Sequence, residues 1–495
     1  MRALLTFLFL SVNALLALYA CHILLLTGLF LLRQRLRQAG RGGPPTLNTF
    51  PRVTVQLPLY NEASVVVRLL LAVAALDYPR DRLQIQVLDD STDQTTEIAL
   101  ATVRQLREGG VDIELVRRPD RNGFKAGAMA HGLQTATGEF VAVFDADFVP
   151  APDFLQRLLP ELLADPGLAF VQARWGHLNR DYSAITRMQS LAIDSHFVVD
   201  QVVRHWAGFP MHFNGTGGIW RRTAIEQSGG WQADTLCEDL DLSYRAILQG
   251  WKPGYMPEVV VPAELSPQLT AFKQQQFRWA RGSIQCTRKL LGPIWRSSLV
   301  WWKKILATLH LSGYMINPLV LALVLLTPLF ALAQGPAMDL GPLWIVSVFA
   351  LSFPLFYAAA LRSVYPSWLL CVLTELPILL LVGCGMALNN SLAILAAVRS
   401  NAVSRFERTP KFNVVRAADR WREHPYRLPV QGLVLAEVGL CLYSLAGCWL
   451  VATWGPWLMV PATLYYAASF GVLAGLGIWE ARDELAGWLR DHVLP

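Results

Sequence analysis

Asp145 and Asp147 have the spacing of a site for a hard cation and a phosphorylated ligand. They close the apolar run EFVAVFDAD, so both carboxylates can lie at the end of one strand and share one cation. Mg²⁺ or Mn²⁺ takes oxygen ligands and commonly bridges to phosphates. A diphosphate held by such a metal leaves more easily, because its growing negative charge is neutralised. The alternative is a pair of loop or helix-capping acids, since D-x-D also occurs by chance.

A second acidic pair, Asp89 and Asp90, ends the run LQIQVLDD. These carboxylates could accept hydrogen bonds from a nucleobase or a ribose. Alternatively, Asp90 or Ser91 could cap the helix that follows. The turn after the preceding apolar run would line the same crevice through Pro58, Tyr60 and Glu62.

Groups that suit the transfer step itself occur in two further motifs. Asp239, beside Glu238 in CEDLDL, could act as the general base for an acceptor hydroxyl. A helix-capping acid would look the same in sequence. Lys125, in RNGFKAGA, could reach a phosphate as a point charge, and a solvated surface lysine is the alternative.

The segment QQFRW contains Gln275, Arg278 and Trp279. An arginine fork can hold a diphosphate, and the face of a tryptophan can stack on a sugar ring. An amphipathic helix at a membrane interface, with aromatic anchors, would give the same pattern.

The elements that must position these side chains alternate between strand and helix. Buried-strand patterns are predicted at 52–59, 83–90, 111–118, 139–147 and 168–175. Helical patterns lie between them at 62–76, 92–110 and 123–136. This alternation predicts an α/β domain with a mostly parallel sheet and helices on both faces. Ligands bind beyond the carboxyl ends of such strands, which is where the acidic pairs lie. Neither a G-x-G-x-x-G nor a Walker A loop is found.

The chain has 53% hydrophobic and 16% charged residues, whereas soluble proteins average about 25% charged. Apolar runs long enough to span a membrane are predicted at 3–32, 305–333, 342–361, 430–453 and 457–478. The ambiguous run 366–398 is predicted to be interfacial or re-entrant, because the basic segment after it should be cytosolic. These spans contain almost no ionisable residues, which disfavours a transporter.

Much of the net charge of +6 lies in clusters beside the apolar runs, which suits contact with membrane lipids. The sequence shows no basic stripe interleaved with aromatic residues, so nucleic-acid binding is not expected. The N-terminus is expected outside and the C-terminus in the cytosol. The predicted division is a transmembrane helix at 1–34, a cytosolic domain at 35–300 that ends in interfacial helices, membrane segments at 301–400, a cytosolic loop at 401–429, two transmembrane helices at 430–480 and a cytosolic tail at 481–495.

Taken in order, the D-D, D-x-D, E-D and Q-x-x-R-W motifs resemble those of processive family 2 glycosyltransferases. The chain is similar to cellulose synthase and more closely to the plant mannan and glucan synthase-like proteins. The resemblance covers roughly residues 50–300 and rests on QVLDDSTD, RNGFKAGA, FDADF, VQARW, TRMQ, FNGTGG, GGW, EDLDL, PAE and QFRW. FERTPK, which begins at Phe406, is similar to the F-x-V-T-x-K gating loop of cellulose synthase, with Arg408 in place of the valine.

The resemblance implies a GT-A α/β fold and a role for each matching residue. The nucleotide sugar would be contacted by Pro58, Tyr60, Glu62, Asp89, Asp90, Lys125, Asp145, Gln275, Arg278, Thr409 and Lys411. Asp145 and Asp147 would hold the metal, and Asp239 would be the general base, with Glu238 beside it in the E-D motif. The acceptor would be contacted by Gly215, Thr216, Cys237 and Trp279, where Cys237 replaces the family's threonine.

These inferences predict an inverting, metal-dependent hexosyltransferase embedded in a membrane. The donor would be UDP-glucose or GDP-mannose, and the residues do not separate the two. The acceptor is a growing β-linked polysaccharide, with translocation across the membrane, or alternatively a membrane lipid. Because both QFRW and FERTPK should lie at the membrane interface, the active site is expected at the junction of the cytosolic domain and the membrane segments.

Overall fold

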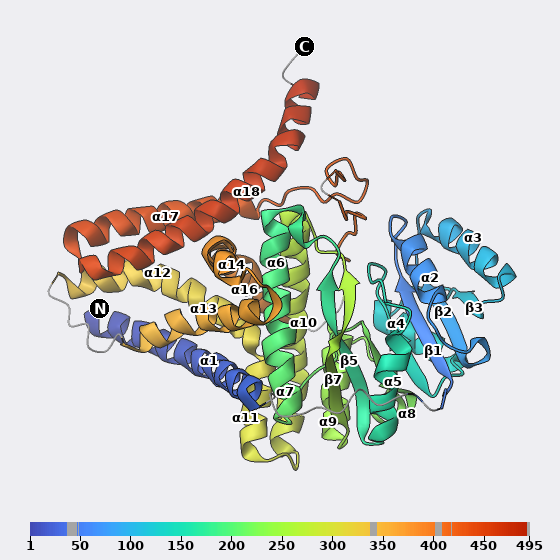
Figure 1. The fold of residues 1–495 in the computed structure, drawn as a ribbon. Coiled ribbons are helices and arrows are strands. Elements are labelled where there is room, and N and C mark those ends of the chain that lie inside the picture. Colours follow the sequence, from blue (N-terminus) through green and yellow to red (C-terminus); the bar gives the residue numbers. More distant parts are fainter. Residues whose placement is uncertain (37–46, 48, 337–343, 401–407, 417, 493–495) are drawn as a thin grey trace.

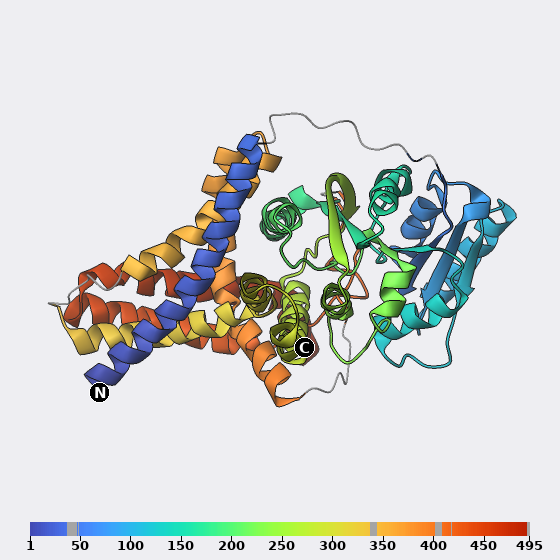
Figure 2. The same ribbon diagram turned by 90° about the horizontal axis from the view of Figure 1, so that it is seen from below.

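The computed structural model describes residues 1–492 except 37–46, 48, 337–343, 401–407 and 417. A β-sheet domain lies beside a bundle of long apolar helices, and α6 (Ala184–Ser195) and α10 (Leu269–Arg296) stand between the two (Figure 1). The view from below shows the same division, with α1 (Arg2–Leu36) running obliquely along the bundle (Figure 2).

Within the described residues, seven strands form one sheet in the order β3-β2-β1-β4-β6-β5-β7. Their bounds are β1 Val53–Leu59, β2 Leu83–Asp89, β3 Ile113–Val116, β4 Phe140–Val143, β5 Leu168–His177, β6 Gly218–Arg221 and β7 Lys252–Ala263. Neighbouring strands are parallel except at β6, which runs antiparallel to β4 and β5. This sheet confirms the expected α/β domain with a mostly parallel sheet.

The five strands predicted from sequence are all found, and β6 and β7 are additions to them. β6 has only four residues, too few for a clear alternating pattern. β7 contains three prolines, at 253, 257 and 262, and proline within a run argues against a central strand. β7 is an edge strand in the observed order, where proline is tolerated.

Helices cover both faces of the sheet because its strands are apolar on both sides. Val55 and Leu57 of β1 pack with Leu69 of α2 in one buried cluster. Val143 of β4 packs with Met129 of α4 in another. The helices of this domain are α2 Val66–Ala74, α3 Thr95–Glu108, α4 Phe124–Thr135, α5 Phe154–Ala164, α6, α7 Val202–Trp206, α8 Arg222–Gln227, α9 Glu238–Leu248 and α10. A π-helical turn, η3 (His196–Gln201), joins α6 to α7.

Five helical stretches within the described residues are long and apolar enough to cross a membrane: Arg2–Leu36, Gly313–Gln334, Trp368–Gly385, Leu433–Trp454 and Trp457–Arg482. The elements after α10 are α11 Trp301–Leu311, α12 Ile316–Gln334, α13 Trp344–Val364, α14 Trp368–Thr374, α15 Leu376–Gly385, α16 Ala387–Arg399, α17 Leu433–Trp454 and α18 Val460–His492. Short 3₁₀ turns lie at Arg80–Arg82, Arg180–Tyr182, Gly313–Met315 and Trp457–Met459.

The span predicted at 305–333 is wrong in its first part. α11 ends before Ser312, and the apolar helix resumes only at Gly313. α11 instead packs on the sheet domain, where His310 Nδ1 and the hydroxyl of Tyr244 in α9 share a hydrogen bond of 2.7 Å. The candidate span therefore begins after this contact.

The ambiguous run 366–398 is folded as three consecutive helices, α14, α15 and α16. Glu375, at the break between α14 and α15, forms an ion pair with Arg180. Asn389 donates to the main-chain carbonyl of Lys273 in α10. Glu375 and Asn389 thus contact the sheet domain and α10, while the interfacial or re-entrant course of the run stays a prediction.

Candidate active site

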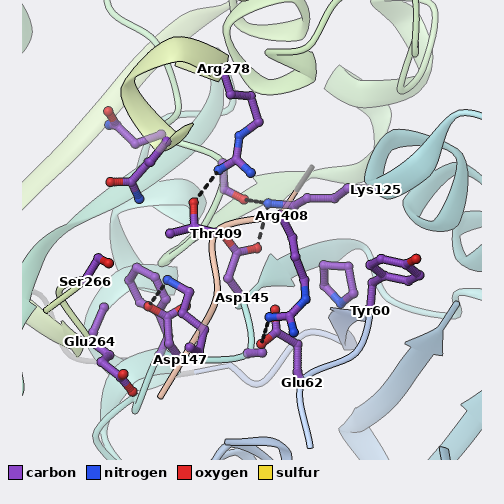
Figure 3. A pocket seen from close by; sticks show the side chains of 18 of the residues that line it. Tyr60, Glu62, Lys125, Asp145, Asp147, Glu264, Ser266, Arg278, Arg408 and Thr409 are labelled. Atoms are coloured by element: carbon purple, nitrogen blue, oxygen red, sulfur yellow. Dashed lines mark hydrogen bonds and ion pairs between the residues drawn. The ribbon is translucent and has the colours of Figure 1, made fainter. Parts of the chain in front are cut away.

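A cavity of about 200 Å³ lies beyond the carboxyl ends of β1 and β4, facing α10 (Figure 3). It brings together nearly all of the site residues predicted from sequence: Pro58, Tyr60, Glu62, Asp90, Lys125, Asp145, Asp147, Gly215, Cys237, Glu238, Asp239, Gln275, Arg278, Trp279, Thr409 and Lys411. Phe406 and Glu407 of the FERTPK segment lie outside the described residues. The segment's Arg408, Thr409 and Lys411 reach the cavity from a part of the chain far from the sheet domain in sequence.

Lys125 connects three parts of this cavity. Its ammonium group donates to Asp145 Oδ1 at 2.6 Å and to the carbonyl oxygen of Gly215 at 3.0 Å. Glu238 Oε1 lies 3.7 Å away from the same nitrogen. The side chain is only 16% exposed and is paired with carboxylates, so the alternative of a solvated surface lysine is wrong. Burial alone would lower the pKa of Lys125, but the carboxylates of Asp145 and Glu238 outweigh it and raise that pKa.

Asp147 is paired with Lys411, whose Nζ donates to Asp147 Oδ2 at 2.7 Å. The backbone N–H of Phe412 donates to Glu264 Oε1 at 2.8 Å, which fastens the same segment to the end of β7. Arg68 of α2 binds the other oxygen of Glu264. The segment that carries Lys411 is therefore held against the D-x-D turn and the end of β7.

Glu62 contacts the substituted position of the FERTPK segment. Arg408 Nη1 donates to Glu62 Oε2 at 3.1 Å (Figure 3). Burial raises the pKa of Glu62 to about 8, and the nearby Arg408 and Lys411 oppose that rise. Arg408 also lies over the ring of Tyr426 at 4.2 Å. Where the resembling family has an apolar valine, this chain has a cation that fastens the segment to the turn after β1.

Asp239 lies in the first turn of α9, as its motif predicts. Burial and the adjacent carboxylate of Glu238 raise the pKa of Asp239 to about 7. A Cβ atom on Gly215 would lie only 3.0 Å from Asp239 Oδ2, and Gly215 has a φ of +81°. Glycine at this position therefore keeps the space beside the carboxylate open.

α10 contributes the QFRW residues from the membrane side of the cavity. Arg278 Nη2 lies 3.4 Å from the hydroxyl of Thr409. The thiol of Cys237 contacts the carbonyl oxygen of Trp279 at 4.0 Å. Helical spacing places Gln275, Arg278 and Trp279 on one face, as residues three and four apart are neighbours on a helix. The helix predicted as interfacial thus also lines the cavity.

Two predicted contact residues lie behind the cavity rather than in its lining. Asp89 accepts hydrogen bonds from the N–H of Ser91 and the hydroxyl of Thr96, so its carboxylate holds the loop after β2. The hydroxyl of Thr216 accepts from the N–H of Asp145 at 2.8 Å and thereby positions the D-x-D turn. We expect both residues to support the site without direct contact with a ligand.

Asp90 lines the cavity and accepts two hydrogen bonds from Arg118. Nε donates to Oδ1 at 2.8 Å, and Nη2 donates to Oδ2 at 2.5 Å. The alternative that Asp90 or Ser91 caps the following helix is wrong, because α3 begins only at Thr95 and Gln94 occupies its N-cap position.

Arg121 also lines the cavity, and sequence reasoning missed it. Its guanidinium group lies over the ring of Tyr60, 3.3 Å from the centroid. Burial lowers the pKa of Arg121, and the nearby Tyr60 and Asp90 oppose that change only in part. The available signal was its place in RNGFKAGA, the motif that also supplies Lys125. Other residues that line the cavity and were not among the predicted site residues include Trp175, His177, Gln189, Asn214, Glu264 and Ser266.

The carboxylates of Asp145 and Asp147 fit a divalent cation when a diphosphate completes its coordination. Among the described residues no group of three or more His, Cys, Asp or Glu side chains is arranged to hold a metal alone. Mg²⁺ is usually bound by one or two carboxylates together with phosphate oxygens, which is what these two residues can offer. In the structure each carboxylate is instead neutralised by a lysine, Lys125 or Lys411. A cation at Asp147 would therefore have to displace Lys411.

Comparison with known proteins gives the same assignment as the motifs. Residues 51–282 match the family described as glycosyltransferase like family 2. Glucomannan 4-beta-mannosyltransferase 1 of Oryza sativa subsp. japonica is 42% identical over 292 residues, which are 57% of this chain and 56% of that protein. Glucomannan 4-beta-mannosyltransferase 2 of Arabidopsis thaliana is 43% identical over 263 residues, 52% of this chain and 49% of that protein. The chain thus matches about half the length of these curated relatives.

Among solved structures, the mannosyltransferase PcManGT from Pyrobaculum calidifontis, in complex with GDP-Man and Mn²⁺, is similar with a TM-score of 0.48 and 23% identity. That comparison covers 77% of this chain and 99% of the other. By sequence, residues 51–282 match family 2 glycosyltransferases, and about half of the chain is similar to the plant glucomannan 4-beta-mannosyltransferases.

Proposed function

We propose that this protein is an inverting, membrane-embedded hexosyltransferase that extends a β-linked polysaccharide with mannose from GDP-mannose. The observation that carries the proposal is one cavity in which Asp239, with a raised pKa, faces the cationic groups of Lys125 and Arg278. A base and a cationic diphosphate site that line the same cavity suit direct displacement. The names of the relatives favour mannose over glucose as the transferred sugar.

The diphosphate of the donor is held by cations from three parts of the chain. Lys125 approaches it from α4, Arg278 from α10 and Lys411 from the FERTPK segment. When bound at Asp145 and Asp147, a divalent cation neutralises charge on the leaving diphosphate. The nucleoside end then lies toward Tyr60 and Asp90, beyond the ends of β1 and β2.

The acceptor hydroxyl approaches from the side of α9 and α10. Asp239 accepts the proton of that hydroxyl. The acceptor's hydroxyl oxygen attacks the anomeric carbon of the donor sugar on the face opposite the diphosphate. A single displacement inverts the configuration, so an α-linked donor gives a β-linked product. Trp279 lines this side of the cavity and offers a ring face on which the acceptor sugar can stack.

The same proposal places the domain at 35–300 and the loop at 401–429 in the cytosol, with the candidate spans in the membrane. A polymer made at the junction would leave through the spans. Transfer to a membrane lipid is the competing outcome, and the product distinguishes it.

The test is incubation of the purified, reconstituted protein with radiolabelled GDP-mannose and, separately, UDP-glucose. We expect insoluble product from GDP-mannose that a β-mannanase degrades, and no such product from Asp239→Asn protein. Chloroform-soluble product would show a lipid acceptor, and incorporation only from UDP-glucose would refute the mannose assignment.

A further inference from the structure

A second cavity, also of about 200 Å³, lies between the sheet domain and the apolar helices. One side is polar and is formed by His22, His196, Asp200, Arg204 and His310. The other side is formed by apolar side chains of the candidate spans, among them Ile23 and Leu26 of α1, Ile316 of α12 and Phe356 of α13. The cavity therefore has the two-sided chemistry of an amphipathic ligand.

Its depth in the bundle follows from the lengths of two helices. Arg2 donates to Gln334 Oε1, so the first residue of α1 lies level with the last residue of α12. From Arg2 to His22 the helix rises about 30 Å, and from Gln334 to Ile316 about 27 Å, at about 1.5 Å per residue. Both distances are close to the thickness of one hydrocarbon core, about 30 Å. The cavity therefore lies near the sheet-domain end of the span formed by α12, while α1 continues as an apolar helix beyond His22 to Leu32.

The polar side of the cavity contains a buried network whose charges cancel. Arg204 Nε donates to Asp200 Oδ1 at 2.6 Å, and Arg204 Nη2 donates to His22 Nε2 at 3.2 Å. His196 Nδ1 lies 3.2 Å from Asp200 Oδ2. Asp200 neutralises Arg204, so the network offers no net positive charge to an anion.

His22 presents an unused hydrogen-bond donor. Because an arginine can only donate, Nε2 of His22 must be the acceptor, and the ring proton is then on Nδ1. Nδ1 is buried and has no hydrogen-bond partner among the described residues. A buried donor without a partner is unfavourable, so a ligand that supplies an acceptor oxygen is stabilised here.

We propose that this cavity is a lateral site for a membrane lipid with an uncharged headgroup that carries hydroxyl and ester oxygens, of the diacylglycerol type. The oxygens would meet the polar network, and the first part of the acyl chains would lie against the apolar side chains of Ile23, Leu26 and Phe356. An anionic phosphate headgroup fits less well, because the network's one arginine is already neutralised.

The wall of this lipid site is also a wall of the active site. His196 Nε2 lies 2.8 Å from Asn214 Oδ1, and Asn214 and Gly215 line the catalytic cavity. On α6, Ala192 lines the lipid cavity and Ile193 lines the catalytic one. An occupant of the lipid site therefore contacts the elements that position Gly215 beside Asp239.

A cavity-filling substitution gives a sharp test. Gly313 lines the cavity, and a Cβ atom built there meets no atom within 4 Å, so Gly313→Leu should occupy part of the cavity. Gly439 in α17 is equally open and lies outside the cavity lining, so Gly439→Leu is the matched control. Ala192→Phe fills the same space from α6 and serves if Gly313→Leu protein does not fold.

The measurement is photolabelling in phosphatidylcholine vesicles that contain a tritiated, photoreactive diacylglycerol. We expect saturable labelling of peptides from α1 and α13, at least fivefold lower labelling in the cavity-filling variant, and unchanged labelling in the control. Excess dioleoylglycerol should compete, and dioleoylphosphatidylglycerol should compete much less. Equal labelling of the filled variant and the control, absence of saturable labelling, or equal competition by the anionic lipid would overturn the proposal.

Discussion

Lys273 of α10 and Glu437 of α17 form an ion pair of 2.7 Å that is almost completely withdrawn from solvent. Both oxygens of the Glu437 carboxylate accept hydrogen bonds from the Lys273 ammonium group, at 2.7 and 2.8 Å. Lys273 lies two residues before Gln275, which lines the catalytic cavity. The pair therefore fastens a candidate membrane span to the helix that supplies the membrane side of the site.

This pair should show strong coupling in a double-mutant cycle. Lys273→Met or Glu437→Leu alone leaves a buried charge without a partner, which typically costs about 3–5 kcal/mol. The double variant removes both charges and should recover most of the loss. Unfolding of the four proteins in detergent measures the coupling energy, and additive single effects would show that the two side chains do not depend on each other.

Glu480 of α18 holds the start of the same helix. Its carboxylate accepts from the N–H groups of Leu269 and Thr270, at 2.5 and 3.1 Å, and from the hydroxyl of Thr270. A carboxylate at a helix N-terminus satisfies free donors and interacts favourably with the helix dipole. Glu480 thereby positions α10 one to two turns before its catalytic face.

Glu480→Ala should raise the KM for the donor by about tenfold, which corresponds to about 1.4 kcal/mol of lost binding. Glu480→Gln keeps acceptor oxygens and should recover part of the affinity. Glu97→Ala, at an exposed site on α3, removes a surface carboxylate and is the control. Kinetic titrations with the donor measure KM and kcat for the three variants. A change in kcat alone would argue against the idea that Glu480 positions Arg278.

These contacts show where sequence reasoning stops. Glu437 lies inside the predicted span 430–453, and Glu480 lies two residues beyond the predicted span 457–478, so neither was expected to bind another part of the chain. Both are paired with α10, but the partners are 164 and about 210 residues away in sequence. No local pattern encodes a pairing over that distance. A transporter is still disfavoured, because these carboxylates bind the sheet domain's last helix rather than each other.

The catalytic cavity was easier to predict because its residues are carried by local motifs at strand ends. Asp145 and Lys125 each stand in a recognisable run, and the parallel sheet brings those runs together. Arg121 was missed because its role depends on the ring of Tyr60, 61 positions earlier in the chain. Asp89 was assigned to the nucleotide because an acid at a strand end looks the same whether it faces the ligand or its own loop.

The pH dependence of transfer should follow the ionisation of Asp239. Its pKa is raised to about 7 by burial and by Glu238, and only the deprotonated form accepts a proton. We therefore expect kcat/KM to rise with pH up to about 7 and to level off above it. Asp239→Asn should lower kcat by about 10²–10⁴ with donor binding retained. Near-normal turnover of that variant would show that another group acts as the base.

The space beside Asp239 should tolerate no side chain. Gly215 has a φ of +81°, which costs an L-residue roughly 1–2 kcal/mol, and a Cβ would lie 3.0 Å from the carboxylate. Gly215→Ala should therefore reduce kcat at least tenfold while the melting temperature falls by only a few degrees. Gly230→Ala has a similar φ of +69° and open surroundings, so it reproduces the strain without the contact. Equal losses in both variants would attribute the effect to strain alone.

The pairing of Asp147 with Lys411 predicts how a metal and the FERTPK segment depend on each other. Lys411 Nζ lies 2.7 Å from Asp147 Oδ2, so a divalent cation and this lysine compete for one carboxylate. Lys411→Met should therefore tighten Mn²⁺ binding in the presence of GDP, measured by calorimetry, while it weakens donor binding because a diphosphate contact is lost. Chelation with EDTA should abolish transfer in both proteins. Full activity in metal-free buffer would contradict the cation at Asp145 and Asp147, and unchanged Mn²⁺ affinity in Lys411→Met would show that the lysine and the metal do not share the site.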